Sequence, residues 1–307
     1  MKTSASAAAT GSAGRDTARA RLRHGRLLLL ALAVAGCSAL PLLYERGPKV
    51  ALWWLDDYLE LDAAQRAATR TALAEWFRWH RATQLLPYAD ALAAWRRDAA
   101  GDLEASEICA MNDALREHFR AGLRHALPAA AGLAFSLDAK QRAHLALRFD
   151  ESNEERREEE LGGTPAAQRA RHTDEAIDRA QSLYGRLDRA QRALIARRIA
   201  HSPYDAHVRL AERAARQRDT LDALARIAAL PAAGRDAAAL AILETLAESY
   251  LHSPRPAYRA YYAKLAAYNC AFIAEVHNGT NAKQRAKAQR KLRGWEEDFR
   301  SLAGNAP

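Results

Sequence analysis

The chain lacks the short motifs that mark several common enzyme classes. It has no HExxH sequence, no pair of CxxC sequences, no glycine-rich phosphate loop and no GxSxG sequence. Residues with β-branched side chains are sparse, which argues against a fold rich in strands. These absences lead us to predict no catalytic motif, no metal site and no cofactor. An enzyme whose acid and base come together only in space stays open as an alternative.

The N-terminal segment has the pattern of a bacterial lipoprotein signal peptide. An arginine-bearing lead precedes the apolar run LLLLALAVAG at 27–36, which is too short to cross a bilayer as a permanent helix. The sequence VAGC at 34–37 fits a lipobox, although it would also suit an ordinary cleavage site. We therefore predict a signal peptide over residues 1–36, cleaved before an acylated Cys37 that carries palmitate-like chains.

Several acyl chains hold a protein stably on a membrane, so the expected mature protein is a periplasmic domain on a lipid tether. Ser38 follows the cysteine where aspartate would retain the protein in the inner membrane. We expect the periplasmic face of the outer membrane. Removing residues 1–36 takes away six basic residues and one acidic residue, so the net charge falls from +9 to +4. Nucleic acid is therefore not an expected partner.

The rest of the chain, residues 37–307, is predicted to be a single all-α domain, a multi-helix bundle of antiparallel helices. Alanine, leucine, arginine and glutamate dominate, and apolar positions recur at intervals of three and four. Prolines and glycines mark the expected ends of helices. The predicted helices cover 49–60, 62–83, 87–100, 103–126, 138–160, 165–185, 188–201, 204–229, 235–251, 255–277 and 281–302.

One six-residue phrase recurs along the chain, as LDAAQR at 61–66, LDAKQR at 137–142, LDRAQR at 187–192 and, nearly, TNAKQR at 280–285. An acidic or amide residue followed three positions later by glutamine is typical of a capping box at a helix start. Each such cap is worth about 1 kcal/mol. The predicted capping pairs are Asp62 with Gln65, Asp138 with Gln141, Asp188 with Gln191, and Asn281 with Gln284.

The same phrase resembles the Leu-Thr-x-x-Gln signature of periplasmic Spy-type chaperones, with aspartate in place of threonine. That resemblance implies a chaperone function as the alternative to a purely structural cap.

A longer resemblance runs along most of the chain after Cys37. WWLDDYLELDAAQ, WHRATQLLPYADAL, FDESNEERREEEL, LYGRLDRAQRALI and HNGTNAKQRAKAQRKLRGWEEDFRSLA occur in this order. In order and spacing they look like a family of proteobacterial lipoproteins catalogued as a domain of unknown function (DUF6279). The resemblance implies a lipid-anchored, all-helical envelope protein and supplies no catalytic residue, substrate or cofactor.

Aromatic residues gather between positions 53 and 95, where five of the six tryptophans lie. They form either an aromatic core that locks the first helices together or a groove that takes up apolar peptide segments. The candidate partner-binding residues are Trp53, Trp54, Tyr58, Trp76, Trp79, His80 and Tyr88.

Cys109 and Cys270 are the only cysteines after Cys37. In an oxidising compartment they could pair, or they could remain buried free thiols that behave as small apolar residues.

These features together lead us to expect a non-enzymatic envelope protein that binds protein or peptide partners in envelope maintenance or stress. A scaffold subunit of one dedicated envelope complex is the first alternative. A hydrolase or small-ligand enzyme is the second.

Overall fold

The computed structural model describes residues 39–304, and within that range it contains helices and no strand. The all-α prediction is therefore confirmed. The helices are α2 (Ala39–Leu59), α3 (Ala63–Asp98), α4 (Ala105–Ser136), α5 (Ala139–Leu161), α6 (Pro165–Tyr184), α7 (Arg189–Ala200), α8 (Ala206–Ala228), α9 (Arg235–Leu251), α10 (Pro256–Asn278) and α11 (Ala282–Gly304).

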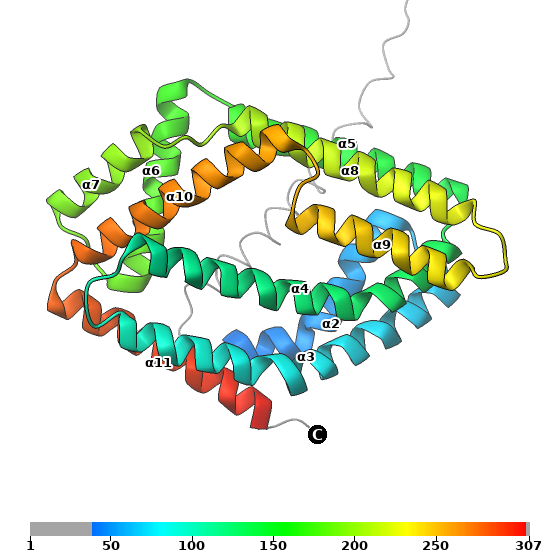
Figure 1. The fold of residues 1–307 in the computed structure, drawn as a ribbon, viewed down its shortest axis with the longest axis horizontal. Helices are drawn as coiled ribbons and strands as arrows, with labels where there is room; N and C mark the ends of the chain where they lie inside the picture. Colours follow the sequence, from blue (N-terminus) through cyan, green and yellow to red (C-terminus); the bar gives the residue numbers. More distant parts are fainter. Residues whose placement is uncertain (1–38, 305–307) are drawn as a thin grey trace, which may run out of the picture.

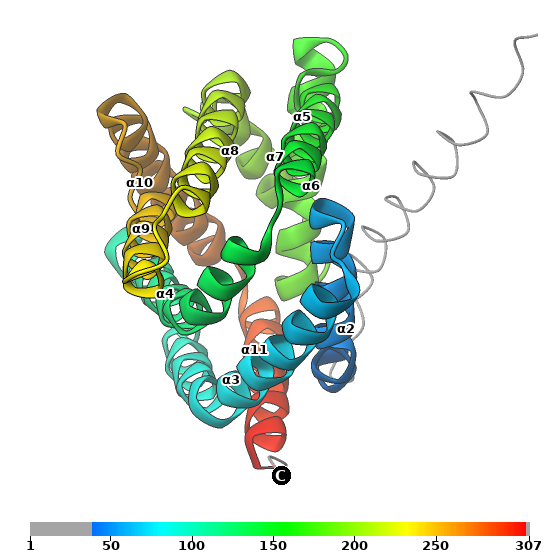
Figure 2. The same ribbon diagram turned by 90° about the vertical axis from the view of Figure 1, so that its right-hand side faces the viewer.

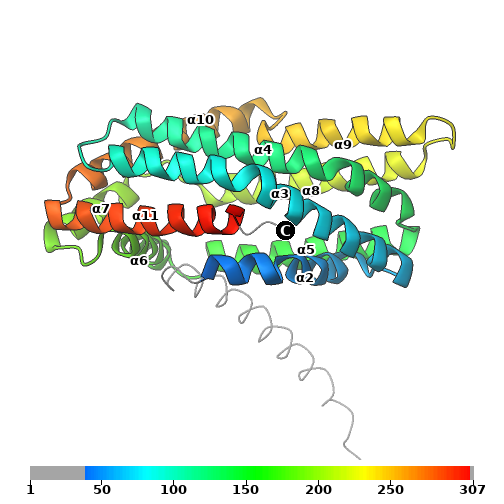
Figure 3. The ribbon, with the colours of Figure 1, turned by 90° about the horizontal axis from the view of Figure 1, so that it is seen from below.

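The helices form an elongated frame in which several packed pairs, such as α5 with α8 and α3 with α11, run antiparallel (Figure 1). Helices α5 and α8 lie together along one long edge, α3 and α11 lie along the opposite edge, and α4 runs between them. Figure 2 shows the frame from one end and Figure 3 shows it from below, with α2 and α10 on opposite sides. The antiparallel course of α3 and α11 follows from their ion pairs, because Arg96 meets Glu296 whereas Asp90 meets Arg300.

Within residues 39–304, four clusters of buried apolar side chains hold the frame together. The largest lies where α2, α4, α5, α8 and α9 meet, and its least exposed members are Ile227 and Ala239. Burial of each leucine or isoleucine side chain there stabilises the fold by about 1.5–3 kcal/mol. Smaller clusters join α4 to α10, α6 and α7 to α11, and α2 and α3 to the end of α11.

Three predicted helix boundaries are wrong because proline does not interrupt the helix there. Helix α2 contains Pro48, whereas its predicted start is residue 49. Helix α3 runs continuously through Pro87, and α4 runs through Pro128. Proline in a helix interior costs about 3 kcal/mol because it removes a backbone hydrogen bond. Buried residues on both sides of Pro87, Leu85 and Ala89, are each 0% exposed, so packing keeps the helix intact. The predicted helices 62–83 and 87–100 are therefore one element.

No helix within residues 39–304 combines the length and the apolar character that crossing a membrane requires. The predicted signal peptide at 1–36 and Cys37 lie outside the described residues. The single-domain boundary at 37–307 and the lipid anchor therefore stay predictions.

Candidate functional site

The four predicted capping boxes are present, and they occur in two cross-connected pairs. At the start of α3, the Asp62 carboxylate accepts from the Gln65 backbone N–H at 2.8 Å, and the Gln65 side chain accepts from the Asp62 N–H at 3.0 Å. Asp138 and Gln141 make the same reciprocal contacts at the start of α5. The two glutamine amides then bond to each other, at 3.0 Å and 2.7 Å between nitrogen and oxygen. Each helix start thus also fixes the position of another.

The second pair repeats this geometry at the other end of the frame. Asp188 with Gln191 opens α7, and Asn281 with Gln284 opens α11. The amides of Gln191 and Gln284 exchange hydrogen bonds of 2.7 Å and 2.9 Å. Asparagine replaces aspartate at the fourth cap without changing the contacts.

Every hydrogen-bonding position of these buried amides is used. The remaining N–H of Gln65 donates to the Ser136 carbonyl at 2.7 Å, and that of Gln141 donates to the Glu60 carbonyl at 3.0 Å. Gln191 and Gln284 donate in the same way to the carbonyls of Gly279 and Arg186. Buried polar groups must be paired. Each glutamine pair therefore holds two loops in place through their backbone carbonyls, in addition to connecting two helix starts.

Most of the candidate aromatic residues lie where α3 packs against α2 and α4. His80 bonds through Nδ1 to the Tyr44 hydroxyl and through Nε2 to the Tyr88 hydroxyl, the latter at 2.9 Å. Trp76 stacks on His80 at 4.7 Å between ring centroids. Burial, together with the nearby His118, lowers the pKa of His80 to about 4. The imidazole is therefore neutral near pH 7 and links two tyrosines.

Trp76 and Trp79 join α3 to α4. The Trp76 indole N–H donates to the Gly122 carbonyl at 2.9 Å, and Trp79 stacks on His125 at 3.8 Å. A Cβ at Gly122 would lie 3.3 Å from the Trp76 ring, so this close approach favours glycine. Tyr88 contacts His118 of α4 at 4.7 Å between ring centroids. Trp76, Trp79, His80 and Tyr88 thus all make interhelical contacts, as a core interpretation requires.

The remaining candidates lie on α2, where Trp53 and Trp54 are 58% and 52% exposed. Trp54 contacts Tyr58 at 4.7 Å between centroids, and Tyr58 contacts Phe149 of α5 at 6.1 Å. Beside these rings Arg148 lies over Tyr58 at 5.6 Å. We call Trp54, Tyr58, Phe149, Arg148 and Asp57 the α2–α5 face.

Asp57 and Arg148 form the charged edge of the α2–α5 face. The guanidinium donates to the Asp57 carboxylate at 2.7 Å and also contacts Glu151 one turn away. Asp57 is 42% exposed in its side chain, whereas Arg148 is 23% exposed. The face therefore combines accessible aromatic carbon with charged groups held in place.

Cys109 of α4 and Cys270 of α10 form a disulfide, with 5.4 Å between their Cα atoms. The bond lies in the small cluster of Leu103, Ile108 and Ala274. It closes a loop between residues 161 positions apart, so it constrains the chain across half of its length.

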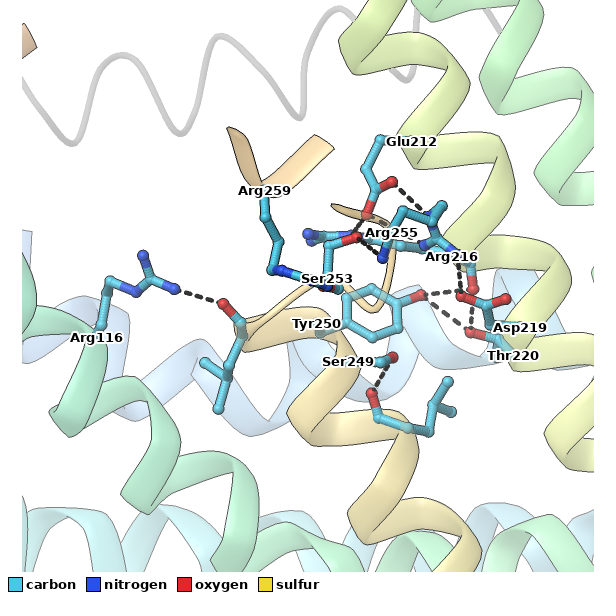
Figure 4. A network of polar contacts seen from close by, with 12 residues as sticks. Arg116, Glu212, Arg216, Asp219, Thr220, Ser249, Tyr250, Ser253, Arg255 and Arg259 are labelled. Atoms are coloured by element: carbon cyan, nitrogen blue, oxygen red, sulfur yellow. Dashed lines mark hydrogen bonds and ion pairs between the residues drawn. The ribbon is translucent and has the colours of Figure 1, made fainter. Parts of the chain in front are cut away.

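A polar network joins α8 to the turn between α9 and α10 (Figure 4). Glu212 is buried and receives Arg255 at 2.6 Å and Arg216 at 2.8 Å, while Arg255 also reaches Asp219 at 2.9 Å. Burial would raise the pKa of Glu212, but hydrogen bonds from Arg255, Arg216 and Ser253 bring it below its usual value. A carboxylate held ionised by two guanidinium groups is a poor proton donor or acceptor. We therefore interpret this network as a structural connection between α8 and the turn that precedes α10.

No group of three or more histidine, cysteine, aspartate or glutamate side chains is arranged to hold a metal ion in the part of the chain that the structure describes. The connections that sequence reasoning missed are those between the caps. The signal was the constant choice of glutamine, since glutamate could complete a capping box but could not donate to a partner amide.

These observations define the class of protein: an all-α protein whose helix starts are connected in pairs by hydrogen bonds between capping glutamines. The chain matches the model of a family described as Family of unknown function (DUF6279) over residues 57–233, and it belongs to that family. No curated protein and no solved structure shows a significant match.

Proposed function

We propose that this protein is a lipid-anchored, non-enzymatic envelope protein on the periplasmic face of the outer membrane, where it binds protein or peptide partners in envelope maintenance or stress. The N-terminal sequence pattern ending at Cys37 supports the anchor. A disulfide suits an oxidising compartment such as the periplasm, which supports the location.

The observation that carries partner binding is the α2–α5 face. Tryptophan, tyrosine and arginine are enriched among the residues that dominate binding energy at protein interfaces. Here Trp54 is 52% exposed beside Tyr58, and Arg148 is already fixed by Asp57. A preorganised aromatic face with a charged edge suits an extended or partly unfolded peptide, because little order must be imposed on binding.

In-cell photo-crosslinking tests this proposal. A photoreactive residue is placed at Trp54 in the native chain, and a matched chain carries it at Trp295 of α11, which is also exposed at 39%. We expect adducts with many unrelated envelope proteins from position 54 and few from position 295. One recurrent adduct would instead support a scaffold of a dedicated complex. Equal adducts from the two positions would contradict a binding role for the α2–α5 face.

A further inference from the structure

Helix α2 presents a second surface, on the side away from the core. Arg46, Lys49, Val50 and Trp53 recur at intervals of three and four residues and therefore share one face of the helix. Val50 is 57% exposed and Trp53 is 58% exposed, and both basic residues are exposed as well. The four side chains line a shallow depression of about 430 Å³. We call these four residues the α2 outer stripe.

The opposite side of α2 is committed to the protein interior. Tyr44 and Leu59 are buried, and Leu52 and Leu55 pack against the largest core cluster. The helix therefore cannot turn to hide the α2 outer stripe. Any cover for Val50 and Trp53 must come from outside the residues that the structure describes.

The composition of the α2 outer stripe matches that of a helix lying in a lipid interface. Tryptophan is enriched at the level of lipid headgroups, and arginine and lysine pair with anionic headgroups while their stems lie on apolar surface. Within residues 39–304, Arg46 and Lys49 form no ion pair with an acidic side chain. Their charges are therefore available to a surface of opposite sign.

The sequence places this helix next to the expected anchor. Helix α2 begins at Ala39, two residues after Cys37. At about 1.5 Å of rise per residue, the helix from its start to Trp53 covers about 20 Å. A chain acylated at Cys37 thus holds the whole α2 outer stripe within a short distance of the membrane, where a weak contact becomes frequent.

We propose that the α2 outer stripe docks on the phospholipid surface, with Arg46 and Lys49 among anionic headgroups and Val50 and Trp53 at the acyl boundary. The inference rests on acylation of Cys37, which belongs to the proposed function. Docking orients the frame on the membrane instead of leaving it free on a tether. Helix α10 lies on the opposite side of the frame from α2 (Figure 3), so it faces the periplasm.

Site-directed spin labelling of the full acylated chain tests this orientation. A nitroxide is attached at Val50→Cys or, as the matched control, at Ile273→Cys of α10, which is 48% exposed. Each new cysteine is the free thiol, because Cys109 and Cys270 are paired. The protein is placed on vesicles of phosphatidylethanolamine and phosphatidylglycerol, and collisions with oxygen and with a water-soluble nickel chelate are measured.

We expect the oxygen-to-nickel collision ratio to be several-fold higher at position 50 than at position 273. Combining Val50→Cys with Arg46→Gln and Lys49→Gln, or omitting phosphatidylglycerol, should lower that ratio toward the control value. Equal ratios at the two positions overturn the proposal. A label at position 50 shielded from both reagents would indicate a second copy of the chain as the cover, which also overturns it.

The mass of the purified chain separates this inference from the proposed function. A chain that carries acyl groups but has a water-exposed label at position 50 keeps the anchor and overturns docking. A chain without acyl groups overturns both. Crosslinking at Trp54 reports on partner binding independently of either result.

Discussion

Glutamine stands at the third helical position of the four paired capping boxes because its amide must accept and donate at once. Gln141→Glu keeps the size and the acceptor but removes both donors, to Gln65 and to the Glu60 carbonyl. We expect the variant to lose about 2–3 kcal/mol of unfolding free energy, since it buries a charge and leaves acceptors unpaired. Urea denaturation measures the change. Gln84→Glu, at a more exposed position, is the control, and an equal loss there would contradict the argument.

A double-mutant cycle tests the pairing itself. Alanine at both Gln65 and Gln141 should show a coupling energy of at least about 1 kcal/mol, because the two amides contact each other. Alanine at Gln65 and Gln284 should be additive within about 0.5 kcal/mol, since these residues belong to different pairs. Additivity in the first cycle would show that the caps act separately.

His80 makes the stability of the folded chain depend on pH. Burial lowers its folded-state pKa from 6.5 to about 4, so the unfolded chain takes up the proton first as the pH falls. The unfolding free energy that the neutral His80 contributes is fully present above pH 6.5 and is lost as the pH falls from 6.5 to about 4. The buried His277 has a lowered pKa for the same reason and adds a loss of the same sign.

His80→Gln should therefore destabilise the protein near neutral pH and lose part of the pH dependence, whereas the His277 contribution remains in both chains. Urea unfolding at pH 7 and at pH 4.5 gives the comparison. The gap in unfolding free energy between wild type and variant should narrow at the lower pH. A gap of constant size would show that His80 is not held neutral by its surroundings.

Among the helices, α4 and α10 are linked both by packing and by the Cys109–Cys270 bond. Replacing both cysteines with serine should lower the unfolding free energy by about 2–5 kcal/mol, because the unfolded chain regains the conformational freedom that the closed loop removes. Denaturation with and without a reductant measures this cost. Reductant should destabilise the wild-type chain and leave the double variant unchanged. A wild-type chain insensitive to reductant would contradict a stabilising role for the bond.

Helix starts could be predicted from sequence because their signals are local. Asp62 and Gln65 cap α3 through contacts within three residues. The passage of α3 through Pro87 could not, because it depends on burial of Leu85 and Ala89 by other helices. Gln65 and Gln141 are 76 residues apart, so their contact leaves no local pattern. The exposure of Trp53 and the burial around His80 likewise depend on which helices lie beside α2 and α3.

The whole molecule extends beyond the family match at residues 57–233. Helix α3 packs along α11, Cys109 bonds to Cys270, and Gln191 pairs with Gln284. These three interactions join residues inside the match to residues that follow position 233. We predict that a fragment of residues 57–233 does not fold cooperatively, whereas residues 39–304 do. Thermal melting followed by circular dichroism compares them. A sharp transition in the fragment would contradict this dependence on the C-terminal helices.

The pairing of α3 with α11 also sets the order of folding events during synthesis. Helix α3 emerges early, but the helix that covers it is the last of the described helices to appear. Until α11 has been synthesised, the α3 side chains that it covers in the folded protein remain accessible to water and to other chains. Contacts so distant along the chain form slowly and expose incomplete intermediates to aggregation. Folding therefore finishes only after nearly the entire polypeptide has been synthesised, and the incomplete chain is open to aggregation in the interval.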